Sequence, residues 1–258
     1  MITEDTQKVA IVTGGSSGIG RVIVERLLQA NYRVAYCGRT RQHVEASQAY
    51  FEANYAKESV LARTQDLADT DSINTLVTEA EARWGRVSVM IYNAGYSPKR
   101  DGVRVPLHEV ELDEWHTVFS VNITAAFRYV QLVLPGMMEA RYGRIILTGS
   151  MGTRDIPRFG GAAYVASKAA LSGLMHSLVS EYSEYGITTN VIAPGNIITN
   201  MTETLDPATW EQVVGRVPLG RLGRPEDIAG AVLLLCSTDG SFINGATIDV
   251  NGGEYLAP

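Results

Sequence analysis

Cysteine is scarce in this sequence, and its two copies lack the spacing of a metal site. Cys37 and Cys236 stand far apart in a chain of 258 residues, which excludes a disulfide-rich scaffold and a Cys-based zinc pattern. We therefore expect no bound metal. A reducing, cytoplasmic compartment suits the two free thiols.

Runs of basic residues and long apolar runs are also missing. The 22 Lys and Arg against 28 Asp and Glu give a net charge of -6, which argues against nucleic acid as a partner. The sequence shows no signal peptide and no apolar run long enough to cross a membrane, so we expect no membrane partner. Residues 1–7 are polar and are expected to form a short flexible lead-in.

Linkers and low-complexity segments are absent too, so residues 1–258 are predicted to form one domain. Short apolar runs alternate with helical spacing, which predicts an α/β fold: a doubly wound, mostly parallel seven-stranded sheet with helices on both faces. Strands are expected near 8–12, 33–37, 60–64, 87–92, 144–149, 187–193 and 246–250. Helices are expected near 19–30, 40–55, 69–84, 112–138, 162–185, 204–214 and 225–237.

A glycine-rich turn follows the first predicted strand. Residues 13–20 read T-G-G-S-S-G-I-G, and helical spacing begins directly after them. Glycines at such a turn let the backbone approach a pyrophosphate, and the N-terminus of the next helix attracts its charge. The spacing G-x-x-x-G-x-G differs from the common G-x-G-x-x-G, and an ordinary tight connection is the alternative interpretation.

Tyr164 and Lys168 stand four residues apart in a predicted helix, which places both on one face. An unperturbed phenol titrates near ~10, so it exchanges protons near neutral pH only if a nearby cation lowers its pKa. We expect Lys168 to lower the pKa of Tyr164, which makes the pair a candidate acid/base site. The alternative is a half-buried ring beside a solvated charge.

The order and spacing of these motifs resemble the short-chain dehydrogenase/reductase family over essentially the whole chain, in particular its 3-oxoacyl-carrier-protein reductases. The matching segments are 13–20, Asp66-Leu67, Asn93-Ala94-Gly95, Asn122, Ser150, Tyr164-x-x-x-Lys168, Pro194-Gly195, 221–229 and Asn244-Gly245…Gly252-Gly253. The resemblance implies a Rossmann-type fold in which residues 1–258 form a single dinucleotide-binding domain. It also implies an NAD(P)-dependent enzyme (EC 1.1.1.-) that interconverts a ketone and a secondary alcohol. Two departures stand out. Tyr92 replaces an Asn that many members have, and the interval from Ser150 to Tyr164 is one residue longer than is common.

The resemblance implies four catalytic residues: Asn122, Ser150, Tyr164 and Lys168. Tyr164 protonates the carbonyl oxygen in reduction or acts as the base in oxidation, and Ser150 orients that oxygen. Lys168 lowers the pKa of Tyr164 and holds the nicotinamide ribose. Asn122 holds a water that relays protons to Lys168; its alternative role is a local backbone bond within a helix.

The second predicted strand ends at Gly38-Arg39-Thr40 and offers no carboxylate for the ribose diol of NAD(H). Gly38 leaves room for a 2′-phosphate and Arg39 matches it as a planar fork, with Arg41 a candidate second contact. NADP(H) is therefore the favoured cofactor and NAD(H) the alternative, in which Arg39 is a solvated loop arginine. The cofactor-binding residues implied by the resemblance are Gly14, Ser16, Ser17, Gly18, Ile19, Gly20, Arg39, Thr40, Asp66, Leu67, Asn93, Ala94, Gly95, Tyr164, Lys168, Pro194, Gly195, Ile197 and Thr199.

The substrate stays open at this point. The expected pocket walls are Tyr96, Met151, Phe159, Asn196, Met201 and Thr202, with residues 196–216 as a substrate lid and loop 96–102 at the entrance. Arg141 matches one basic position with which carrier-protein reductases dock an acidic carrier, but Tyr185 occupies the second, in an acidic helix end.

We therefore expect a small-molecule ketone or alcohol as the substrate. The alternatives are 3-oxoacyl-carrier-protein reduction, NAD-dependent alcohol, sugar or steroid dehydrogenation, and a non-catalytic nucleotide-binding regulator. The family also implies a homotetramer. Residues 130–134 and 169–174 could pair between subunits, and their burial against the chain's own sheet is the alternative.

Overall fold

The computed structural model describes residues 7–69, 72–199 and 207–257. A sheet of seven parallel strands, in the order β3-β2-β1-β4-β7-β8-β9, lies at its centre. The strands are β1 (Val9–Thr13), β2 (Arg33–Gly38), β3 (Val60–Thr64), β4 (Val89–Tyr92), β7 (Gly143–Thr148), β8 (Ile187–Pro194) and β9 (Thr247–Val250). The sheet is doubly wound, as predicted from the sequence, and its strand order reverses between β1 and β4.

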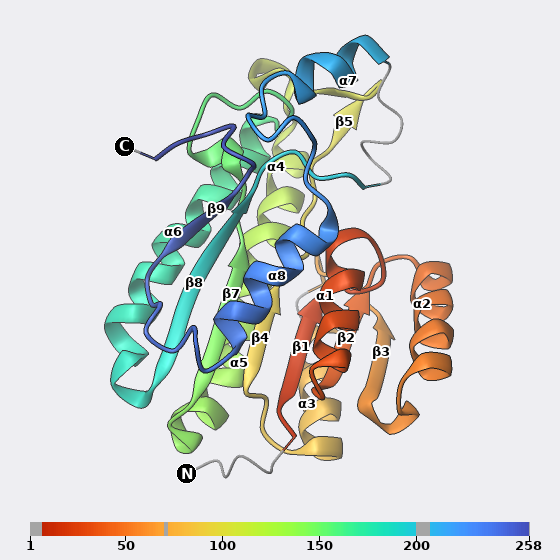
Figure 1. Cartoon of the computed structure of the whole chain (residues 1–258), viewed down its shortest axis with the longest axis vertical. Coiled ribbons are helices and arrows are strands. Elements are labelled where there is room, and N and C mark those ends of the chain that lie inside the picture. Colours follow the sequence, from red (N-terminus) through yellow and green to blue (C-terminus); the bar gives the residue numbers. More distant parts are fainter. Residues whose placement is uncertain (1–6, 70–71, 200–206, 258) are drawn as a thin grey trace.

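Helices cover both faces of the sheet (Figure 1). One face carries α1 (Gly18–Gln29), α2 (Arg41–Asn54) and α8 (Pro225–Cys236). The other carries α3 (Ile73–Trp84), α5 (Ala125–Ala140) and α6 (Ala162–Tyr182). Strand β1 shows why two faces are covered: Ala10 and Val12 pack in one apolar cluster, Val9 and Ile11 in the other, because successive side chains alternate.

The predicted helix 112–138 is one continuous helical stretch with a change of geometry inside it. Helix α4 (Leu112–Phe119) passes through a π-helical turn at Ser120–Thr124 into α5. By length and composition alone, Leu112–Ala140 is apolar enough to cross a membrane, contrary to the expectation that no such run exists. Tyr129, Val133 and Met137 of this stretch pack into the core beside the sheet.

A short hairpin interrupts the segment predicted as a loop at 96–102. Strands β5 (Lys99–Arg100) and β6 (Val103–Arg104) pair antiparallel across Asp101 and Gly102. Both turn residues have positive φ, 51° and 77°, as a two-residue type I′ turn requires. The sequence analysis missed this hairpin, although the pair Asp101-Gly102 between the two strands is a typical hairpin signal.

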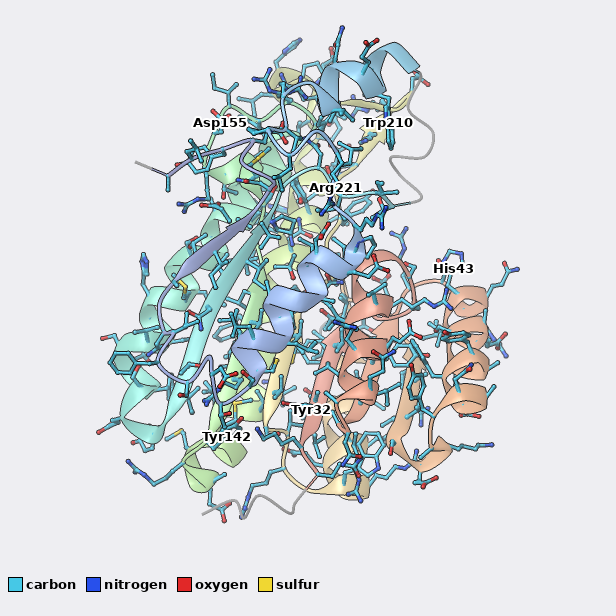
Figure 2. All side chains as sticks on the ribbon, in the orientation of Figure 1. Tyr32, His43, Tyr142, Asp155, Trp210 and Arg221 are labelled. Carbon is cyan, nitrogen blue, oxygen red and sulfur yellow. The ribbon has the colours of Figure 1, made fainter. Side chains whose placement is uncertain are left out.

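The loops at the carboxyl ends of the strands gather at one end of the molecule. His43, Asp155 and Trp210 lie toward this end, whereas Tyr32 and Tyr142 lie at the opposite end (Figure 2). Helix α7 (Pro207–Val214) is also found there, within the segment expected to form the lid. Two predictions fall outside the described residues. They are the start of the predicted helix 204–214, at residues 204–206, and the pocket candidates Met201 and Thr202.

Candidate active site

A cavity of about 700 Å³ opens over the carboxyl ends of the strands, where the sequence predicted the site. Its wall contains most of the predicted site residues: Gly14, Ser16, Ser17, Ile19, Arg39, Thr40, Asp66, Leu67, Asn93, Ala94, Gly95, Tyr96, Ser150, Met151, Phe159, Tyr164, Lys168, Pro194, Gly195, Asn196, Ile197 and Thr199. Gly18, Gly20 and Asn122 are not part of the wall.

The glycine-rich turn between β1 and α1 has the geometry of a phosphate cradle. Gly14 and Gly18 adopt φ of 67° and 51°, a region that favours glycine. A Cβ on Gly20 would lie 2.1 Å from the carbonyl oxygen of Gly14, so no side chain fits there. Ser17 is the N-cap residue of α1, but its side chain makes no capping hydrogen bond, and the first turn holds no acidic residue. The helix N-terminus thus fits an anionic group.

Thr13 ties this turn to the loop after β4, a role that sequence reasoning did not assign. Its Oγ1 accepts hydrogen bonds from the backbone N–H groups of Asn93 and Ala94, both at 3.1 Å. The carboxyl ends of β1 and β4, where the strand order reverses, are therefore held together by a buried hydroxyl.

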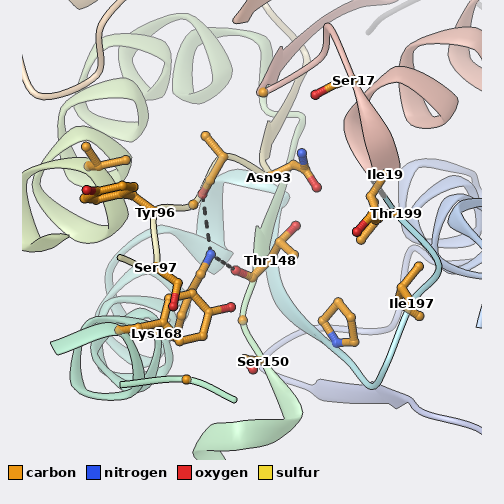
Figure 3. Close-up of a pocket in the computed structure, with 18 of the residues that line it drawn as sticks. Ser17, Ile19, Asn93, Tyr96, Ser97, Thr148, Ser150, Lys168, Ile197 and Thr199 are labelled. Atoms are coloured by element: carbon orange, nitrogen blue, oxygen red, sulfur yellow. Dashed lines mark hydrogen bonds between the residues drawn. The ribbon is translucent and has the colours of Figure 1, made fainter. Parts of the chain in front are cut away.

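Ser150, Tyr164 and Lys168 all line this cavity. Ser150 and Lys168 lie near each other in the close-up (Figure 3). Ser150 follows β7, and its Oγ accepts a hydrogen bond from the backbone N–H of Gly152 at 3.1 Å. Burial raises the pKa of Tyr164, and the Ser150 side chain opposes that shift. The expectation that the pKa of Tyr164 is lowered is therefore wrong for this structure. Removing the phenolate from water raises the pKa by more than the Ser150 side chain lowers it.

Lys168 is buried and held by two carbonyl groups (Figure 3). Its Nζ donates hydrogen bonds to Thr148 O at 2.6 Å and to Ala94 O at 3.4 Å. Nζ lies 6.0 Å from the centroid of the Tyr164 ring. Burial lowers the pKa of Lys168 from 10.5 to about 8, because the ammonium loses solvation that the two carbonyls replace only in part.

Asn122 lies in the π-helical turn and fastens the segment that follows β4. Its Nδ2 donates to Tyr96 O at 3.0 Å and to Ser167 Oγ at 2.9 Å, while its Oδ1 accepts from Tyr96 N at 2.7 Å. The alternative of a local helix bond is therefore wrong, whereas the water relay stays a prediction. The Tyr92 hydroxyl donates to Val121 O in the same turn, which gives the departure at Tyr92 a structural role.

Arg39, in the loop after β2, also lines the cavity, and β1 and β4 separate β2 from β7 in the sheet. Its guanidinium carbon lies 5.7 Å from the centroid of the Tyr96 ring. Arg41 is directed elsewhere: its Nε lies 2.7 Å from Glu45 Oε1, both side chains are exposed, and Arg41 is not part of the cavity wall. A Cβ on Gly38 would lie 2.1 Å from Ser16 Oγ, so packing against Ser16 also requires glycine at this position.

Several wall residues were missed by sequence reasoning, notably His43, Val121 and Arg158. Ser97 and Lys99 confirm that loop 96–102 borders the cavity. Arg158 lies in the interval from Ser150 to Tyr164. This interval is one residue longer than is common in the family, and that extra length was the sequence signal for an unusual loop here.

The fold, the phosphate cradle and the Ser150–Tyr164–Lys168 group define a Rossmann-type oxidoreductase that uses a nicotinamide cofactor. The chain belongs to the short-chain dehydrogenase/reductase family, because the family model of the short chain dehydrogenases matches residues 8–210. It is accordingly an NAD(P)-dependent oxidoreductase that acts on small-molecule substrates.

Named relatives agree with this assignment. The chain is 37% identical to the 3-oxoacyl-[acyl-carrier-protein] reductase FabG of Haemophilus influenzae over 97% of this chain and 99% of that protein. It is also 37% identical to the FabG of Escherichia coli over 96% of this chain and 98% of that protein. A 3-oxoacyl-[acyl-carrier protein] reductase from Brucella melitensis superposes with a TM-score of 0.90 at 32% identity, covering 98% of this chain and 92% of the other.

Proposed function

We propose that this enzyme reduces a small or medium-sized ketone to a secondary alcohol with NADPH and catalyses the reverse reaction with NADP. The observation that supports this most directly is that Ser150, Tyr164 and Lys168 line the same cavity as Arg39. A carboxylate at the end of β2 would favour NAD(H), because it would accept hydrogen bonds from the ribose diol. This strand ends without one.

The proposed chemistry uses two hydroxyl groups. Ser150 donates a hydrogen bond to the substrate carbonyl oxygen, and Tyr164 protonates that oxygen as it becomes an alkoxide. Because burial raises the pKa of Tyr164, the phenol is protonated at neutral pH and ready to act as the acid. Lys168 holds the ribose hydroxyls near Tyr164, and Asn122 positions the segment after β4. When bound, the nicotinamide supplies or accepts the hydride.

The cofactor would be held along the whole cavity. The turn from Gly14 to Gly20 would take the pyrophosphate, and Asp66 with Leu67 the adenine. Arg39, with Thr40, would take the 2′-phosphate. Asn93, Ala94 and Gly95 would line the crevice, while Pro194, Gly195, Ile197 and Thr199 would face the nicotinamide. Tyr96, Met151, Phe159 and Asn196 would contact the substrate. The described parts of segment 196–216, residues 196–199 and 207–216, would form the lid over it.

Two alternatives have specific support. The names of the FabG relatives favour 3-oxoacyl-carrier-protein reduction. Against it, the Arg141 guanidinium is bonded to Glu184 O at 2.5 Å and lies 5.8 Å from the Tyr185 ring, so it is engaged by the acidic helix end. The second alternative, use of NAD(H), is supported by a 3-oxoacyl-[acyl-carrier protein] reductase structure from Brucella melitensis that holds bound NAD. That chain is 31% identical and superposes with a TM-score of 0.88, covering 98% of this chain and 93% of the other.

A panel of ketones, alcohols and one acyl-carrier thioester, each run with the four nicotinamide cofactors, tests these functions together. We expect ketone reduction with NADPH, followed at the nicotinamide absorbance. Turnover of the carrier thioester alone would establish the first alternative, and preference for NADH the second. Tight cofactor binding without turnover of any compound would identify a non-catalytic regulator.

We also propose that the chain forms one domain and assembles as a homotetramer in the cytoplasm. Val130, Val133 and Leu171 are buried in the chain's own core, so part of the predicted contact faces is already used. Phe127 on α5 is 49% exposed and Leu112 on α4 is 65% exposed, which leaves apolar surface for subunits to cover. Light scattering at micromolar concentration should give four times the chain mass; a monomer would contradict the proposal.

A further inference from the structure

Positive side chains gather at the cavity, although the whole chain carries a net charge of -6. Among the described residues in the cavity wall, Arg39, Lys99, Arg158 and Lys168 are cationic, and Asp66 is the one carboxylate. The proposed function uses Arg39, Lys168 and Asp66. It gives no role to Lys99 and Arg158, which we call the cationic rim.

The two rim residues come from different segments that are fastened to each other. Lys99 pairs with Arg104 across the hairpin β5–β6. Arg104 Nη1 donates a hydrogen bond of 2.6 Å to the carbonyl oxygen of Pro157, the residue directly before Arg158. The hairpin therefore brings Lys99 to the loop that carries Arg158.

That loop packs against the catalytic side chains. A Cβ on Gly152 would lie 3.4 Å from Ser150 Oγ and 3.7 Å from Pro157 Cβ, and a Cβ on Gly160 would lie 2.8 Å from Tyr164 Cδ1. Pro157 and Gly160 flank Arg158 closely on the chain. A substrate whose carbonyl meets Ser150 and Tyr164 thus has the cationic rim within reach of its distal part.

The charge of the rim is not neutralised by the protein. Within the described ranges, neither Lys99 nor Arg158 forms an ion pair, and both are exposed. Two nearby arginines, in contrast, do form ion pairs. Arg100 nitrogens lie 3.7 Å from Glu109 Oε2 and 3.5 Å from Glu114 Oε2, and Arg154 Nε lies 2.9 Å from Asp249 Oδ1. Unpaired cations beside a cleft attract an anionic ligand and hold it by charge-assisted hydrogen bonds.

We propose that Lys99 and Arg158 bind a carboxylate or phosphate that the carbonyl substrate carries at a distance from its reacting carbon. The substrate class is then an oxo acid or a phosphate-bearing oxo compound. The proposal rests on the proposed function, since that function places the carbonyl at Ser150 and Tyr164.

Matched pairs of substrates separate the charge from the rest of the molecule. Levulinate and its longer oxo-acid homologues are compared with their methyl esters, and acetoacetyl-CoA with the acetoacetyl thioester of N-acetylcysteamine. The first pair reports on a carboxylate and the second on a phosphate. We expect a higher kcat/KM for the anionic member of at least one pair, by roughly 10- to 150-fold, the effect of one charged hydrogen bond.

The variants Lys99→Gln and Arg158→Gln, alone and combined, should remove most of that preference and leave kcat/KM for the neutral members unchanged. Arg41→Gln is the control, because it removes an exposed positive charge outside the cavity wall. It should leave the preference intact. Raising the ionic strength should weaken the wild-type preference and have little effect in the double variant.

Equal kcat/KM for charged and neutral members in the wild type would overturn the proposal, as would an equal loss for both members in the rim variants. Titration calorimetry of the cofactor complex with each oxo acid and its ester measures binding without turnover. A charge preference in binding without any turnover would support the rim and refute the proposed function, so the two failures are distinguishable.

Discussion

Tyr164 is the residue on which the proposed proton transfer depends. Tyr164→Phe keeps the half-buried ring but removes the hydroxyl, so kcat for ketone reduction should fall by about 10²–10⁴-fold, the usual contribution of a general acid. Circular dichroism and the Kd for NADPH should stay close to wild type. A variant with wild-type kcat would show that another group protonates the carbonyl.

Lys168 differs from Tyr164 because it should act on cofactor binding as well as on turnover. Its pKa of about 8 means that the ammonium is lost as pH rises through this value. If the charge is needed, kcat/KM falls above about pH 8, and Lys168→Arg moves that fall to higher pH because a guanidinium stays charged.

Lys168→Met should weaken NADPH binding and abolish the pH dependence near 8. Fluorescence titration of the cofactor and the pH profile of kcat/KM measure the two effects separately. Unchanged cofactor affinity in Lys168→Met would mean that this side chain does not hold the ribose.

At the scale of elements, the sequence predicted the strands and helices well where local patterns decide them. The seven core strands follow from short continuous apolar runs, and the turn at residues 13–20 follows from its glycine spacing. The π-helical turn at Ser120–Thr124 was not predictable, because it depends on Asn122 and Tyr92 bonding to groups distant in sequence. The pKa of Tyr164 was missed for a similar reason: burial is a tertiary property that i,i+4 spacing does not reveal.

The loop after β1 and the end of β2 act together in the proposed cofactor selectivity. Gly38→Asp alone would drive its Cβ into Ser16 Oγ, at 2.1 Å, so it should lower the melting temperature and not simply change preference. The triple variant Ser16→Gly, Gly38→Asp and Arg39→Ile removes that clash. It gives the ribose diol a carboxylate and deprives the 2′-phosphate of its cation.

This triple variant should lose roughly 10- to 150-fold in kcat/KM with NADPH, the value of one charged hydrogen bond, and lose less or gain with NADH. Steady-state kinetics with both cofactors provide the measurement, and Ser16→Gly alone is the control for the altered turn. If the wild type already prefers NADH, Arg39 is a loop arginine and NADP(H) selectivity is wrong.

The molecule as a whole buries many groups that must stay protonated. Burial raises the pKa of Cys37 to about 11, of Cys236 to about 12 and of Tyr36 to about 12, and it also raises the pKa of Tyr92 and Tyr129. In the unfolded chain, thiols ionise near ~8.5 and phenols near ~10. Above those values the unfolded state binds fewer protons than the folded state, so the free energy of unfolding decreases with rising pH.

We therefore expect the urea midpoint, measured under reducing conditions, to fall steadily above about pH 9. Each such group contributes up to about 1.4 kcal/mol per pH unit between its unfolded and folded pKa. Lys168 acts in the opposite direction from pH about 8 to 10.5, because its folded pKa is lowered. Cys236→Ala removes one of the two thiols and should flatten the decrease between pH 9 and 10, where the thiol ionises in the unfolded chain and the phenols largely do not. A midpoint that holds constant or rises from pH 9 to 11 would show that these buried groups reach water before the chain unfolds.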